Sequence, residues 1–94
     1  MHQYRTKLKI ISDVLYAVLS SSGEGGTSLS ALMRRSNLSY RGVEQLLSQL
    51  LSAGLLTERK AEKGMRYVVS AKGVEYLAHY NQFRTFAESY GLLM

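Results

Sequence analysis

Hydrophobic and polar positions alternate with different periods along the chain. Between residues 40 and 53 apolar side chains return every three or four positions, which predicts a helix that buries one face. Ser39 is placed to cap its first turn, and Gly54 follows its end, where a left-handed residue terminates a helix easily. The polar residues of this segment fall on the opposite face. The apolar positions are Val43, Leu46, Leu47, Leu50 and Leu51.

A shorter amphipathic segment precedes this helix. Its pattern predicts a helix over Leu29–Arg35, followed by a break at residues 36–38, with Leu29, Leu32 and Met33 facing the core. A short helix, a three-residue turn and a longer capped helix are typical of a helix-turn-helix.

A first helix is expected over Tyr4–Leu19, before a Ser- and Gly-rich loop. A residue pair near Thr27 is positioned to add a short strand to a later hairpin. The buried stripe of the first helix is expected to comprise Leu8, Ile11, Leu15, Val18 and Leu19.

After Gly54 the period changes from helical to alternating. Two short β runs, the second over Met65–Val69, flank a polar loop at residues 60–64, which predicts a hairpin. Across residues 58–66 four cations outnumber two glutamates. A charged hairpin is usually only solvated, but directly after a helix-turn-helix it is typical of a wing that contacts a DNA backbone. The wing cations are Arg59, Lys60, Lys63 and Arg66.

Ser70 is placed to cap a last helix over Ala71–Tyr90, with Val74 and Leu77 packing on the core. Beyond them, aromatic and small residues follow a heptad-like spacing, and an uncovered seam of this kind favours association. We predict a homodimer through this helix; the alternative is a monomer whose last helix folds back on the first, around Tyr16 or Ile10. The predicted dimer interface is Tyr76, Leu77, Tyr80, Phe83, Phe86, Ala87 and Tyr90.

The composition of the 94 residues fits one small folded unit with a mainly α (α+β) fold. We predict a winged helix-turn-helix DNA-binding domain over residues 1–70 and a dimerisation helix over residues 71–94. The formal net charge of +5 favours a polyanionic partner, nucleic acid before an anionic membrane surface, although many basic proteins bind neither.

Catalytic and metal-binding patterns are missing from the sequence. It has no cysteine, and its two histidines, His2 and His79, have no ligand-like neighbours in sequence. The glycine-rich stretch before Thr27 lacks the Lys-Ser/Thr of a phosphate-binding loop. We therefore predict no enzyme, cofactor, metal or small-molecule substrate. The sequence also lacks a signal-peptide pattern and a membrane-length apolar run, which predicts a cytoplasmic, nucleoid-associated protein.

Three stretches resemble winged helix-turn-helix proteins: SALMRRSNLSYRGVEQLLSQLLSAGLL, ERKAEKGMRYVVS and SAKGVEYL. The NLSY turn, the AGLL exit and the long aromatic last helix more narrowly resemble the archaeal 10a-type DNA-binding proteins. This resemblance implies double-stranded DNA binding in a chromatin or transcriptional role. It also implies a homodimer joined by an antiparallel coiled coil of the last helices. The last helix here is shorter and more aromatic than in that family.

A DNA-binding hypothesis assigns roles to the polar face of the second helix of the motif. Arg41 and Gln45 would read base edges, because Arg–guanine and Gln–adenine are the geometrically natural pairs. Glu44 shares this face and would either accept from cytosine or repel phosphate. The alternative is a winged-helix protein-interaction module without DNA binding. The predicted site residues outside the wing are Arg34, Arg35, Ser39, Tyr40, Arg41, Glu44, Gln45 and Ser48.

Overall fold

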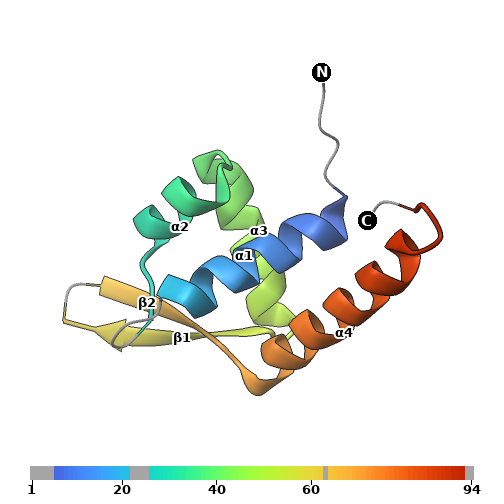
Figure 1. Ribbon diagram of the computed structural model, residues 1–94. Coiled ribbons are helices and arrows are strands. Elements are labelled where there is room, and N and C mark those ends of the chain that lie inside the picture. Colours follow the sequence, from blue (N-terminus) through green and yellow to red (C-terminus); the bar gives the residue numbers. More distant parts are fainter. Residues whose placement is uncertain (1–5, 22–25, 63, 93–94) are drawn as a thin grey trace.

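The computed structural model describes residues 6–21, 26–62 and 64–92. The described residues form four helices and a two-stranded antiparallel sheet, which confirms the predicted mainly α winged helix-turn-helix fold (Figure 1). The elements in chain order are α1 (Lys7–Ser21), α2 (Leu29–Ser36), α3 (Tyr40–Ser52), β1 (Leu56–Ala61), β2 (Gly64–Val69) and α4 (Ala71–Glu88).

The core lies where α1, α2, α3 and the start of the hairpin meet. Leu15, Leu32, Leu50 and Leu56 are fully buried there. The predicted inner face of α3 is confirmed, since four of its five apolar positions are buried and Leu51 packs partly on the core.

The inner face of α1 differs from the prediction. Val14, Leu15 and Val18 form its buried centre, whereas Leu8 and Leu19 remain almost half exposed at its edges. The five-residue apolar pattern was compatible with several rotations of the helix, and packing against α2 and α4 selects one of them. The predicted start at Tyr4 lies outside the described residues.

Local hydrogen bonds set the ends of α3. The Gly42 N–H donates to Ser39 Oγ at 3.1 Å, which confirms the predicted cap. At the other end, Gly54 has a φ of +79°, and its N–H donates to the Leu51 carbonyl at 3.1 Å. The Leu55 N–H reaches back to the Leu50 carbonyl at 2.9 Å, completing a Schellman motif that turns the chain into β1.

The hairpin is longer and tighter than predicted. Its register runs from Leu56 opposite Val69 to Ala61 opposite Gly64, so most of the expected loop belongs to the strands. The predicted short strand is confirmed: Thr27 forms a bridge with Tyr67 through N–H to carbonyl bonds of 3.0 and 2.8 Å.

Helix α4 runs beside α1 (Figure 1). Ser70 caps its first turn, since the Gly73 N–H donates to Ser70 Oγ at 3.1 Å, which confirms the predicted cap. The start of α4 is held against the rest of the domain, because the Ser70 hydroxyl donates to the Gly54 carbonyl at 2.6 Å and Leu77 on the second turn enters the core. Farther along, the Tyr76 hydroxyl donates to the Leu8 carbonyl at 3.2 Å. Val74, predicted to pack on the core, is instead exposed because it lies on another side of the helix.

Candidate nucleic-acid interface

The outer face of α3 is a continuous polar surface. It is exposed along its length, because the apolar residues of the helix all turn toward the core. The described residues engage none of its charged groups in an ion pair. The exposed residues of this face are Tyr40, Arg41, Glu44, Gln45, Ser48 and Gln49.

The turn before α3 brings the end of α2 next to this face. Asn37 adopts the left-handed conformation with a φ of +58°, which the short Asn side chain tolerates better than most residues. Arg34 and Arg35 occupy the last turn of α2 and are exposed. Ser39 accepts the capping bond from Gly42, so its hydroxyl hydrogen remains available for a donor contact to an anion.

The hairpin does not place all of its cations together. Arg59 lies directly opposite Arg66, so these two guanidinium groups share one face of the sheet. Lys60 pairs with Met65 and therefore points to the other face. Lys63, the fourth predicted wing cation, lies outside the described residues.

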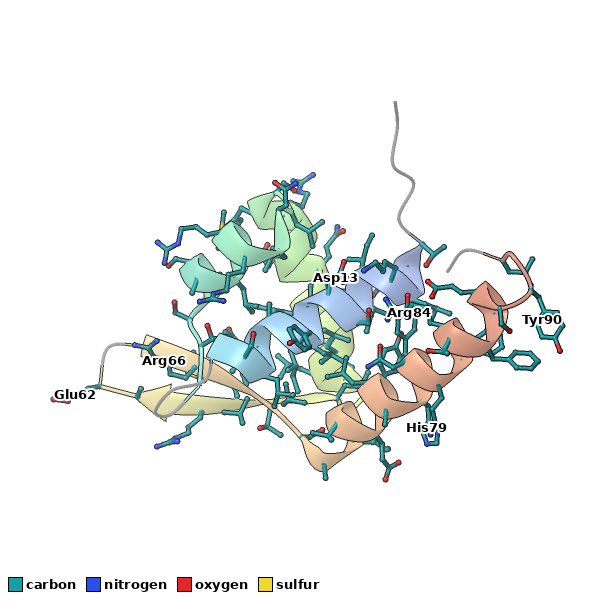
Figure 2. The ribbon with its side chains drawn as sticks, viewed as in Figure 1. Asp13, Glu62, Arg66, His79, Arg84 and Tyr90 are labelled. Atoms are coloured by element: carbon teal, nitrogen blue, oxygen red, sulfur yellow. The ribbon has the colours of Figure 1, made fainter. Side chains whose placement is uncertain are left out.

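The Arg59–Arg66 pair has a physical consequence. Like charges directly opposite one another destabilise a hairpin, and an anion bound between them removes that penalty. Neither arginine forms an ion pair within the part of the chain that the structure describes. The end of the hairpin, where Figure 2 labels Glu62 and Arg66, projects away from the helices.

Tyr67 lies on the face of the hairpin that packs against the core. The pKa of the Tyr67 phenol lies above its ordinary value. The largest cause is burial, followed by the Glu58 carboxylate opposite Tyr67 in the sheet and then by Tyr40. The phenol therefore stays neutral at physiological pH. Tyr67 thus serves as an uncharged residue that packs against the core on the sheet face opposite Arg59 and Arg66.

Beside the outer face of α3 is an open hollow of about 220 Å³, which the sequence analysis missed. A sequence pattern separates inner from outer positions, but a hollow between two helices depends on how those helices pack. Gln49 is also new at this site, since it lies on the polar face of the helix but was not among the predicted site residues. The hollow is lined by Lys7, Ile10, Leu38, Gly42, Gln45, Leu46 and Gln49.

The predicted dimer seam on α4 requires correction. Leu77, Tyr80 and Ala87 are only 8%, 7% and 3% exposed within the single chain, so they are not available to a partner in this conformation. Tyr76 is half buried and stacks on Tyr80, with ring centroids 6.2 Å apart. On this inner face α4 therefore folds back on α1, as the alternative prediction has it.

A second stripe of α4 remains on the surface. Phe83, Phe86 and Tyr90 are 54%, 59% and 70% exposed and touch one another, with successive ring centroids 6.5 and 5.1 Å apart. Figure 2 shows Tyr90 pointing outward near the end of the helix. His79 is also exposed, one turn before this aromatic stripe.

A helix-turn-helix followed by a two-stranded hairpin defines the winged-helix class. The model of the winged helix-turn-helix family matches residues 4–88. The chain therefore belongs to the winged helix-turn-helix family. A comparison with curated proteins finds no match.

Solved structures share this fold at low sequence identity. Sso10a-2, a DNA-binding protein from Sulfolobus solfataricus, is 20% identical, with a TM-score of 0.75 over 90% of this chain and 84% of that chain. TubR bound to 24 bp of tubC, from Bacillus thuringiensis serovar israelensis, is 22% identical, with a TM-score of 0.64 over 85% and 98%. A second TubR structure, described as a type III plasmid segregation protein, is 22% identical, with a TM-score of 0.61 over 87% and 92%.

The predicted likeness to the 10a-type proteins is thus confirmed at the level of fold. Neither the matched family nor these structures are described as enzymes, in agreement with the prediction of a non-enzymatic protein. None of the helices in the described parts of the chain combines the length and apolarity that crossing a bilayer requires.

Proposed function

We propose that this protein binds double-stranded DNA as a homodimer and acts as a transcriptional regulator or chromatin-associated protein of the nucleoid. The observation that carries the proposal is the exposed polar face of α3, flanked by cations that have no ion pair among the described residues. Residues 1–70 form the DNA-binding part in this account, and residues 71–94 provide the contact with the second copy.

Helix α3 enters the major groove by its N-terminal half. Arg41 and Gln45 contact base edges, and Ser48 follows one turn after Glu44 on the same exposed surface. Glu44 accepts from a cytosine amino group, since a carboxylate facing phosphate would weaken binding. The phosphate contacts around the helix come from Arg34, Arg35, Ser39 and Tyr40.

The wing lies along the phosphate backbone. Arg59 and Arg66 provide one paired contact, because they face each other in the sheet. Lys60 adds a cation on the other face of the sheet, and Lys63 is proposed as a further wing cation from its place in the sequence alone. Two matched structures support DNA as the partner, since one is described as a DNA-binding protein and the other is bound to a 24-bp DNA.

The aromatic stripe of α4 provides the dimer contact. Phe83 and Phe86 of α4 and Tyr90 of the turn just after it follow one another at spacings of three and four, as on a helix that pairs with another helix. A two-fold axis lets the same stripe on two copies cover itself, giving a short coiled coil. Such a dimer presents two α3 helices to successive major grooves.

The DNA contact is tested by removing one cation from α3. Arg41→Ala is expected to weaken binding to a duplex by about 1–3 kcal/mol if Arg41 reads a base. Lys72→Ala is the matched control, because it removes the same charge from an exposed position on α4. Fluorescence anisotropy of a labelled duplex measures both. Equal affinities for the two variants would place the DNA contact elsewhere.

The dimer is tested by sedimentation velocity. Phe86→Ser is expected to shift a dimer to monomer, because it puts a hydroxyl at the centre of the aromatic stripe. Tyr16→Ser on α1 removes a comparably exposed aromatic residue and should leave the dimer intact. A wild-type protein that sediments as a monomer at every concentration would overturn the dimer.

The second candidate function is a protein-interaction module. The exposed aromatic stripe of α4 favours it, because this surface does not depend on DNA. In that case the protein would self-associate or bind another protein while showing no saturable DNA binding. The anisotropy measurement therefore decides between the two functions.

A further inference from the structure

The hollow beside α3 lies on the side of the recognition helix that borders α1. Its walls come from three elements: Ile10 of α1, Leu38 of the turn, and Leu46 of α3. These three side chains make its surface mainly apolar. Apolar surface at the edge of an otherwise polar helix face is complementary to a ligand that is itself partly apolar.

Gly42 keeps this hollow open. It lies in the first turn of α3, where a Cβ atom would be 3.2 Å from Ser39 Oγ and 3.8 Å from Leu38 Cβ. A methyl group there would require the Ser39 hydroxyl to shift by a few tenths of an ångström, whereas the backbone conformation itself does not require glycine. An alanine is intrinsically better in a helix by up to about 1 kcal/mol. The glycine leaves an open concave surface at that position.

Polar groups border the hollow. Gln45 and Gln49 line it from successive turns of α3, and Lys7 lines it from α1. An amide side chain can bind adenine N6 and N7 together, and a lysine can hold a phosphate. The amides and the apolar wall are complementary to the major-groove edge of an A·T base pair, and the lysine is complementary to a neighbouring phosphate.

The thymine of such a pair supplies the apolar element. Its 5-methyl group is the one apolar group that the base pairs present in the major groove. We propose that the hollow receives the 5-methyl groups of thymines beside the bases that Gln45 contacts. A methyl group needs about as much space as a water molecule, roughly 30 Å³, so a hollow of about 220 Å³ is large enough for the 5-methyl groups of two stacked thymines.

This inference rests on the proposed DNA binding and adds a base preference to it. Duplexes rich in A·T pairs bind more tightly than G·C duplexes of equal length because of the methyl contact. Burying one methyl-sized apolar group strengthens binding about fourfold. Cytosine, which has a hydrogen at the same ring position, leaves the hollow empty.

The test compares thymine with deoxyuridine in one A·T-rich duplex. The two bases differ only in the 5-methyl group, so charge and hydrogen bonding are unchanged. Fluorescence anisotropy of the wild-type protein is expected to show a loss of affinity of about fourfold or more in the deoxyuridine duplex. Methylating the cytosines of a G·C duplex at the same ring position should strengthen binding by a similar factor.

Two variants locate the effect. Gly42→Ala places a methyl group in the hollow and should reduce the thymine-to-deoxyuridine ratio toward one. Ser52→Ala changes an exposed residue in the last turn of α3, outside both the hollow and the proposed DNA contacts, and should preserve the ratio.

The outcomes separate this inference from the proposed function. Equal, saturable binding of the thymine and deoxyuridine duplexes would overturn the inference and leave DNA binding in place. A Gly42→Ala protein that prefers thymine over deoxyuridine as strongly as the wild type would also overturn the inference, because the methyl contact would then lie elsewhere. The absence of binding to either duplex would overturn both proposals.

Discussion

Helices α3 and α4 begin in the same way and then differ. In each, a serine caps the first turn and accepts from the N–H of a glycine three residues later, at 3.1 Å in both cases. Helix α3 then buries one apolar face and exposes a polar one. Helix α4 also buries an inner face, but its outer surface carries an aromatic stripe.

The two glycines show how the same local motif serves different surroundings. A Cβ on Gly73 would collide with the Leu55 carbonyl oxygen and lie 2.6 Å from Val69 Cγ1, so α4 can approach the wing only through glycine. A Cβ on Gly42 would meet only the cap and Leu38 Cβ at ordinary or slightly short distances. The motif predicts where a helix starts, whereas the packing around it decides what the position does.

The largest expected effect separates a buried apolar side chain of α3 from an exposed one of α4. Leu50→Ala should lower the free energy of unfolding by about 2–5 kcal/mol, because Leu50 is fully buried in the core. Phe86→Ala should change it by less than about 0.5 kcal/mol in the monomer. Urea denaturation at low protein concentration measures the free energy of unfolding of both variants. A similar loss of stability in the two would mean that the aromatic stripe is part of the core.

The two glycines give the next test. Gly73→Ala should destabilise the fold by about 1–3 kcal/mol or more, since the backbone carbonyl it meets cannot easily move. Gly42→Ala should stay within about 1 kcal/mol of the wild type, because helix propensity offsets the close contact with the cap. Thermal unfolding by circular dichroism compares them. A stable Gly73→Ala protein would disprove the close packing of α4 on the wing.

The two capping serines should differ by a smaller amount. The Ser70 side chain accepts the cap bond and also donates its hydroxyl to the Gly54 carbonyl at 2.6 Å, whereas among the described residues the Ser39 side chain makes the cap bond alone. Ser70→Ala is therefore expected to cost about 2 kcal/mol and Ser39→Ala about 1 kcal/mol. Chemical denaturation resolves this difference, and an inverted order would remove the proposed link between α4 and the end of α3.

The helix-turn-helix could be predicted from sequence because its signals are local. The caps at Ser39 and Gly54 and the apolar period between them lie within one short stretch. The predicted strands of the hairpin were too short, because its charged residues were assigned to the loop. Cross-strand pairing from Leu56–Val69 to Ala61–Gly64 includes most of those residues in the sheet.

The faces of α4 could not be predicted from sequence alone. Aromatic residues at Tyr76, Tyr80, Phe83, Phe86 and Tyr90 fit more than one seam, and the contact with α1 decides which of them is buried. Tyr80 turns inward and the last three remain outside. The hollow beside α3 could not be predicted either, because it depends on how α1 and α3 pack and its residues Lys7 and Gln49 are far apart in sequence.

The most direct test of the central claim is the salt dependence of DNA binding by the wild-type protein. Fluorescence anisotropy of a labelled duplex is measured over a series of salt concentrations. We expect saturable binding whose affinity falls steeply with salt, with a log–log slope of about −0.9 for each phosphate contacted. Several cations of α2, α3 and the wing should contribute to that slope. Binding that is absent at low salt, or that salt leaves unchanged, would contradict the claim that this winged helix is a DNA-binding protein.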